Sequence, residues 1–227
     1  NLEKNLLYLG QVYLDPRDAL NEFVSNAADE YVQAHRHAGI IRITLHRRGH
    51  RPFVKVSDDG RGMNRDKLRR VAQSLCESEK AGGAAEAVVG EKGIGLLAFA
   101  TLGDRCEITS RASGEAPTHS LRLARGEAEC ALAEEGPRAR DRSGTDVTIS
   151  GLTPDVLRVL TLPKLAEYFR IRRRQALLRG DYAIQLFEGD RSAFVRPEEY
   201  RGAPFVVLPR ATPFGLVDFH LFLWPHG

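Results

Sequence analysis

Hydrophobic positions near the start of the chain recur at the spacing of a helix. Asp15 is a candidate N-cap, Pro16 fits the first helical position and Asp18 places an acid in the first turn. Gly39 is predicted to end this helix. The apolar residues share one face, which predicts packing against a core, and they are Leu20, Phe23, Val24, Ala27 and Tyr31.

Alternating β-branched residues come next. The runs "GIIRITLH" (39–46) and "PFVKVSD" (52–58) predict two strands joined as a hairpin. Residues 64–75 predict a second helix, capped by Asn64, with Leu68, Val71 and Leu75 facing inward. Residues 76–90 are rich in small side chains without a clear period and predict a mobile loop. A short apolar helix is expected within 94–103.

The second half of the chain returns to strands and then to a helix. Strand patterns run from 104–111 to 144–151, a helix is predicted over 162–180, and a strand follows at 181–189. A last strand is predicted over 214–224, and prolines at 204, 209 and 213 precede it. We therefore expect one domain over 1–200, with 201–227 as a linker and the candidate start of a second domain.

Composition narrows the class of protein. The chain has 227 residues, of which 42% are hydrophobic and 28% charged, as in ordinary globular proteins. No apolar run is long enough to span a bilayer, so no membrane partner is expected. The net charge of +3 gives no general case for nucleic-acid binding. Three widely spaced cysteines predict neither a metal site nor a disulfide framework, which favours a reducing, cytoplasmic setting.

The first helix carries a polar stripe. Glu22, Asn26 and Asp29 are spaced i, i+4, i+7, so they line up opposite the apolar face. One interpretation is a solvated helix face, as most polar stripes are. The other is a site in which a carboxylate orients water and an amide oxygen binds Mg²⁺, because hard cations prefer oxygen ligands.

Two glycine-rich motifs follow the hairpin. "DDGRGM" (58–63) is either a turn after a strand or a place where a carboxylate meets a buried ligand beside a closely approaching backbone. "GEKGIG" (90–95) has neither the dinucleotide-binding glycine spacing nor the ending of a Walker A loop. It is either a flexible linker or a loop whose N–H groups bind an anion at the start of a helix.

The order of these motifs resembles the GHKL ATPase superfamily. This superfamily includes gyrase B, heat-shock chaperones of the ninety-kilodalton class, MutL, MORC proteins and histidine kinases. The resemblance covers roughly residues 5–150, in the order E-x-x-x-N-x-x-D, D-x-G-x-G-M, G-x-x-G-x-G and "GTDV". It implies an α/β two-layer sandwich, the Bergerat fold, with a mixed sheet on one side, helices on the other, and ATP between helices under a lid.

The resemblance also implies roles for single residues. Glu22 is the expected general base, Asn26 the Mg²⁺ ligand and Asp29 a supporting residue near the pocket. Asp58 is expected to accept a hydrogen bond from the adenine amino group. The remaining expected nucleotide contacts are Gly60, Gly62, Met63, Gly93, Ile94, Gly95, Leu96 and Thr145.

Residues 76–90 match the lid of the family in position. Lys80 is placed to reach a phosphate, or is a solvated lysine. Asp59 stands where the family often has Asn, and we assign it no ligand contact.

The resemblance leaves two function classes. One is a Mg²⁺-dependent ATPase with slow turnover that drives a conformational or dimerisation clamp, like chaperone or MORC members, with a client protein or DNA as partner. The other is a non-hydrolysing ATP-binding module or a sensor-kinase-type phosphotransfer domain. No histidine lies in a phosphoacceptor context, which favours the first. The basic stretch 170–179 is either a DNA contact or a solvated helix face.

Overall fold

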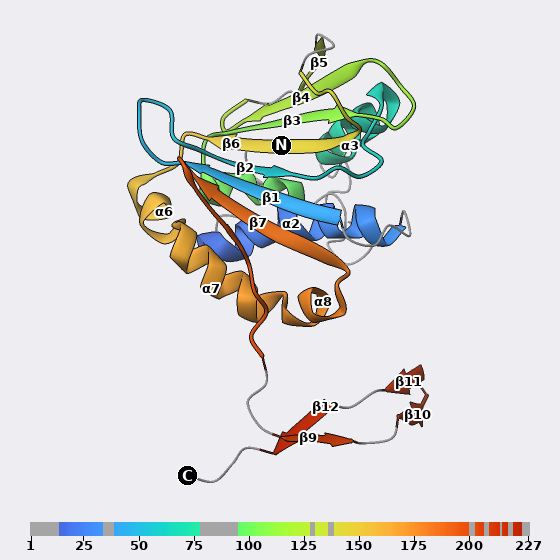
Figure 1. Ribbon diagram of the computed structural model, residues 1–227. Coiled ribbons are helices and arrows are strands. Elements are labelled where there is room, and N and C mark those ends of the chain that lie inside the picture. The colour runs from blue at the N-terminus through green and yellow to red at the C-terminus, as the bar shows by residue number, and fades with distance from the viewer. Residues whose placement is uncertain are drawn as a thin grey trace, which may run out of the picture.

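A mixed eight-stranded sheet forms the centre of the structure (Figure 1). The computed structural model describes residues 14–33, 39–77, 95–127, 130–135, 139–199, 203–206, 209–213, 215–217 and 220–223. The strand order is β5-β4-β3-β6-β2-β1-β7-β8. All neighbours are antiparallel except β1 and β7, which are parallel. The strands are β1 (Gly39–His46), β2 (Phe53–Ser57), β3 (Arg105–Arg111), β4 (Thr118–Ala124), β5 (Ala131–Glu135), β6 (Gly144–Ser150), β7 (Tyr182–Glu188) and β8 (Arg191–Phe194).

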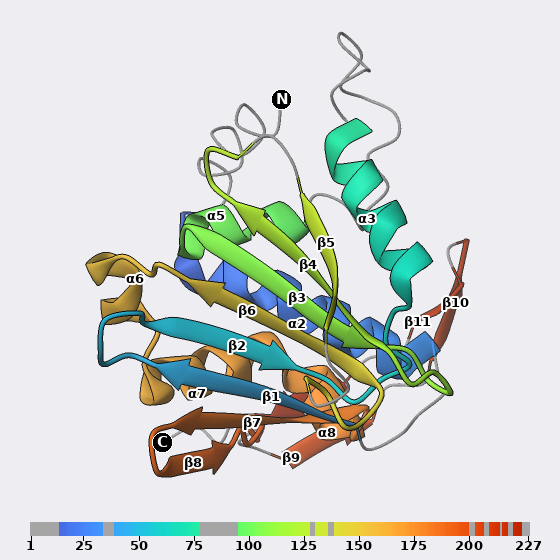
Figure 2. The ribbon, with the colours of Figure 1, turned by 90° about the horizontal axis from the view of Figure 1, so that it is seen from above.

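The helices cover one face of this sheet. They are α2 (Pro16–Gln33), α3 (Arg65–Glu77), α5 (Phe99–Leu102), α6 (Pro154–Val159), α7 (Leu162–Arg172) and α8 (Arg174–Arg179). Figure 2 shows α2, α7 and α8 behind the strands. The sheet is half-buried because its side chains alternate: Ile41 and Ile43 are fully buried, whereas Arg42 between them is partly exposed. The arrangement is the two-layer α/β sandwich that the motifs predict.

The apolar face of α2 packs against the core, as its spacing predicts. All five of its predicted core residues are buried: Leu20, Phe23, Val24, Ala27 and Tyr31. The hairpin of β1 and β2 is confirmed, with Ile43 opposite Val56. The cap of α3 is confirmed as well, because the Lys67 N–H donates to Asn64 Oδ1 at 3.0 Å.

Two boundaries differ from the prediction, and a third falls partly outside the described residues. The helix α2 is described as far as Gln33, residues 34–38 are not described, and Gly39 begins β1, where a side chain would collide with the Tyr31 ring at 2.3 Å. The helix α3 continues through Cys76 and Glu77, since neither residue interrupts a helix. The predicted helix over 162–180 is divided at Arg173, whose backbone leaves the helical region (φ −108°, ψ 13°).

The strands after residue 203 form two separate small sheets. β9 (Ala203–Val206) pairs with β12 (His220–Leu223), and β10 (Arg210–Thr212) pairs with β11 (Gly215–Val217). The single strand predicted over 214–224 is therefore wrong: it comprises β11 and β12, two strands with different partners. Gly215 adopts a positive φ of 117°, which lets the chain turn back onto β10.

Candidate functional site

The helix α2 presents Glu22 and Asn26 of its polar stripe beside Gly95, the one described residue of the second glycine motif. A methyl group at Gly95 would lie 3.2 Å from Glu22 Oε2 and 4.0 Å from Asn26 Nδ2. Glu22 is half-buried, while Asn26 and Asp29 are exposed. The chain is helical over 95–97, and Leu96 packs its side chain into the core at 6% exposure. Because glycine has no side chain, this turn can approach the Glu22 carboxylate closely.

Asp58 lies where β2 ends and is 6% exposed. Its Oδ1 accepts a hydrogen bond from the Gly60 N–H at 2.8 Å, and its own N–H donates to the Thr145 carbonyl at 2.9 Å. Burial raises the pKa of the Asp58 carboxyl to about 6, against the opposing effects of the Gly60 N–H and the Arg140 charge. A buried carboxylate with few donors around it is a strong acceptor for an N–H group of a ligand.

The glycines after Asp58 are required by contacts inside the protein. Gly62 has a φ of +67°, and a methyl group there would lie 1.9 Å from the Arg111 carbonyl oxygen. At Gly60 the same group would lie 2.9 Å from Asp58 Oδ1 and 3.0 Å from Glu30 Cβ. The predicted role of both glycines was clearance for adenine; the structure gives them an additional, structural reason.

A buried hydroxyl pair holds the end of this loop. Ser110 Oγ accepts from the Met63 N–H at 2.8 Å, donates to the Gly144 carbonyl at 3.0 Å and shares a hydrogen bond with Thr145 Oγ1 at 2.9 Å. Ser110 is fully buried and Thr145 is 8% exposed. The predicted residues Met63 and Thr145 are thus tied together through Ser110, which sequence reasoning missed.

Asp59 forms hydrogen bonds within the protein. The Tyr31 hydroxyl donates to Asp59 Oδ1 at 2.7 Å and accepts from the Asp59 N–H at 3.2 Å. Burial, with the Asp59 hydrogen bond adding to it, raises the pKa of Tyr31 well above its usual range. Asp59 thereby fixes the loop to α2.

Arg140 is a second residue that sequence reasoning missed. Its guanidinium, 10% exposed, donates to the Asp58 carbonyl at 2.7 Å and forms an ion pair with Asp146. Gly144 lets this region close, because a methyl group there would lie 2.3 Å from the same Asp58 carbonyl. No pattern around Arg140 marks it in the sequence, since Asp58, the residue that it holds, lies 82 positions away.

The predicted residues fall at two ends of one stretch of α2. Glu22, Asn26 and Gly95 lie together at one end, and Gly60 contacts Glu30 at the other. Glu22 and Glu30 are separated by about 12 Å along the helix axis, at 1.5 Å per residue. Asp29 is exposed on α2. Lys80, Gly93 and Ile94 lie outside the described residues.

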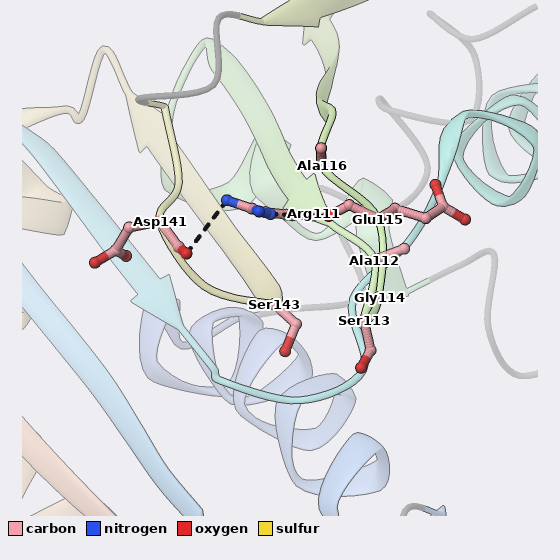
Figure 3. A pocket seen from close by; sticks show the side chains of 8 residues that line it. All are labelled: Arg111, Ala112, Ser113, Gly114, Glu115, Ala116, Asp141 and Ser143. Carbon is pink, nitrogen blue, oxygen red and sulfur yellow. Dashed lines mark hydrogen bonds between the residues drawn. The ribbon is translucent and has the colours of Figure 1, made fainter.

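Two open depressions lie near this region without including its predicted residues. The first, of about 400 Å³, is lined by the 111–116 loop with Asp141 and Ser143 (Figure 3). Arg111 closes one side by donating to the carbonyls of Arg140 and Asp141 at 3.0 and 3.2 Å. The second, of about 360 Å³, lies along α7 and α8.

No group of three or more His, Cys, Asp and Glu side chains among the described residues is arranged to hold a metal ion. The assignment of Mg²⁺ to Asn26 rests on the resemblance, in which nucleotide phosphates share the ion. None of the described helices combines the length and the apolar character needed to cross a membrane.

Comparison with known proteins identifies the family. No curated protein matches the chain in a sequence search. The family profile described as histidine kinase-, DNA gyrase B-, and HSP90-like ATPase matches residues 14–139. That match covers more than half of the chain and includes α2, both glycine motifs and the first five strands of the sheet. The chain therefore belongs to the family of histidine kinase-, DNA gyrase B- and HSP90-like ATPases.

Proposed function

We propose that this chain binds ATP with Mg²⁺ along α2 and hydrolyses it slowly. The observation that carries the proposal is the convergence of two distant glycine motifs on one helix: Gly95 beside Glu22 and Asn26, and Gly60 beside Glu30. About 12 Å separates these ends along the helix axis, which leaves room for adenine at the Glu30 end and for the phosphates at the Glu22 end.

The base end recognises adenine through Asp58. Its carboxylate accepts a hydrogen bond from the exocyclic amino group. Thr145 and Met63 hold the loop through Ser110. Gly60 and Gly62 let the backbone of this loop pass close to the adenine. The charge of a buried acceptor strengthens such a bond, because little water competes for it. Asp29 supports the pocket from the exposed side of α2.

The phosphate end provides groups that bind the phosphates and a general base, Glu22. The N–H groups of Gly93, Ile94, Gly95 and Leu96 hold the phosphates, with Lys80 as a further contact. Mg²⁺ on Asn26 would neutralise phosphate charge. Glu22 takes the proton of the attacking water as the water oxygen bonds to the γ-phosphorus and the bond to the β-phosphate oxygen breaks.

We further propose that nucleotide drives a clamp. Residues 1–200 form the ATP-binding domain, and 201–227 form a linker and the candidate start of a transducer-like domain. ATP would close a homodimer and hydrolysis would reopen it, in a cytoplasmic protein that acts on a client protein or DNA as chaperone-like or MORC-like members do.

Substitution of Glu22 separates hydrolysis from binding. We expect Glu22→Ala to lower ATP turnover by about 100-fold or more, since general bases contribute that much. Its affinity for Mg²⁺ and ATP, measured by calorimetry, should stay within about threefold of the wild type. Glu167→Ala, an exposed carboxylate on α7, is the matched control.

Three outcomes are informative. Equal turnover in Glu22→Ala and the control removes Glu22 from the mechanism. A wild type that binds ATP without phosphate release supports the non-hydrolysing module instead. A wild type that binds no ATP refutes the proposal as a whole.

A further inference from the structure

Arg173 connects the break between α7 and α8 to the helix that carries the catalytic stripe. Its Nε donates to Asn21 Oδ1 at 2.8 Å, and its Nη2 donates to the Asn21 carbonyl at 3.0 Å and to Ser25 Oγ. Ser25 Oγ in turn donates to the Asn21 carbonyl at 2.9 Å. One guanidinium thus engages three oxygens on consecutive turns of α2.

These oxygens belong to the neighbours of the proposed catalytic residues. Asn21 immediately precedes Glu22, and Ser25 immediately precedes Asn26. Adjacent residues on a helix are about 100° apart, so the row that Arg173 holds borders the row that faces Gly95. Asn21 is only 7% exposed, which places this contact in the packed layer between helices.

Such a contact fixes the rotation and axial position of α2, which hydrophobic packing alone does not define. The apolar face of α2 holds the helix on the sheet, but burial of apolar area is non-directional and tolerates small rotations. A guanidinium presents its N–H groups in a rigid plane, so three bonds from it define both the rotation and the axial position of the partner. A displacement of about 1 Å at a reacting group can lower a rate by about 100-fold.

We propose that Arg173 is a positioning residue for ATP hydrolysis, holding α2 in the rotation that places Glu22 and Asn26 against the Gly95 turn. This inference rests on the proposed function of that site. It also explains why the helix breaks at Arg173: the non-helical backbone there (φ −108°, ψ 13°) lies at the start of the side chain that reaches α2.

The test compares Arg173→Ala with Arg179→Ala in the full chain. Arg179 lies on α8 and forms an ion pair with its neighbour Asp181, so it controls for loss of a positive charge. The readouts are the affinity for adenosine, the gain in ATP affinity on adding Mg²⁺, and kcat per folded molecule. Adenosine reports on the adenine end around Asp58, whereas Arg173 contacts Asn21 and Ser25.

We expect Arg173→Ala to lose most of the Mg²⁺-dependent gain and to reduce kcat about tenfold or more, while adenosine affinity stays within about threefold. Arg173→Lys keeps the charge but not the planar guanidinium, so its kcat should lie between those of the wild type and Arg173→Ala. Ser25→Ala, a milder change, should lower kcat by about two- to fivefold, and serves if Arg173→Ala does not fold.

Opposite results overturn the inference. A purely structural role would lower the unfolding temperature and leave the Mg²⁺-dependent gain and kcat per folded molecule at wild-type values in all three variants. A parallel loss of adenosine affinity would equally contradict it. A wild type that binds neither adenosine nor ATP overturns the proposed function, and this inference with it.

Discussion

Replacing Asp58 by Asn should separate nucleotide binding from stability. The two side chains have the same shape, and an Asn oxygen can still accept the Gly60 N–H that now bonds Oδ1 at 2.8 Å. The amide nitrogen would then face the ligand as a donor, opposite another donor. Loss of a charge-assisted hydrogen bond costs about 1.5–3 kcal/mol, which predicts an adenosine affinity about ten- to a hundredfold weaker.

Stability should change in the other direction. Burial moves the pKa of the Asp58 carboxyl from 3.8 to about 6, which corresponds to roughly 3 kcal/mol against the charged form at neutral pH. Between these values the folded state binds more protons than the unfolded state, so wild-type stability falls as pH rises to about 6 and then levels. Asp58→Asn removes this cost and should unfold at equal or higher urea concentration at pH 7.5, with the difference vanishing below about pH 4.

The same titration predicts a pH dependence of binding. An adenine amino group needs the ionised carboxylate, so wild-type affinity for adenosine should be about tenfold lower at pH 5 than at pH 7.5. Adenosine is preferred to ATP because its phosphates do not contribute a titration of their own. The pH dependence should be absent in Asp58→Asn.

The assay is calorimetry with adenosine at three pH values, alongside urea unfolding. Asp59→Asn is the matched control, since this neighbouring acid contacts Tyr31 and keeps an oxygen for that hydroxyl. Its adenosine affinity should remain within about threefold of the wild type. Unchanged adenosine affinity in Asp58→Asn, or a pH dependence that persists in it, would refute the assignment of the adenine contact.

Two further substitutions test the loop that carries Asp58. Gly62→Ala should lose about 3 kcal/mol or more in urea unfolding, because the methyl group would meet the Arg111 carbonyl at 1.9 Å, whereas Gly114→Ala, also at positive φ but in open space, should lose about 1 kcal/mol. Equal losses would show that backbone conformation alone explains Gly62. Ser110→Ala should lose about 1–3 kcal/mol by leaving the Met63 N–H and Thr145 without their shared partner, while Ser74→Ala on the exposed side of α3 should change stability little; a Ser110 loss as small as that of Ser74 would contradict the network.

Periodicity was sufficient for the elements that bury one clear face. The core face of α2, the β1–β2 hairpin and the Asn64 cap of α3 follow from local patterns that tertiary contacts do not oppose. The single helix over 162–180 was not correct: it divides at Arg173, whose side chain bonds Asn21, a partner 152 positions away. Local patterns carry no information about such a partner.

The candidate site divides in the same way. Glu22, Asn26 and Asp58 could be proposed from the sequence because each belongs to a short motif with its own spacing. The hydrogen bonds of Ser110, Arg140 and Tyr31 could not be predicted, because each acts through a loop or helix that becomes its neighbour only on folding. The role of Gly62 could not be anticipated either, since its collision partner is the carbonyl of Arg111.

The close approach of Gly62 to that carbonyl bears on how such chains degenerate. A descendant that no longer used nucleotide would still need this glycine to close the fold, so the glycine pattern would survive as a relic. The buried acid before it has no such protection, because without a ligand it only weakens the protein. In a lineage that loses nucleotide binding, the first change should therefore be a neutral residue in place of Asp58. The G-x-G that follows it, Gly60 to Gly62, should still be intact.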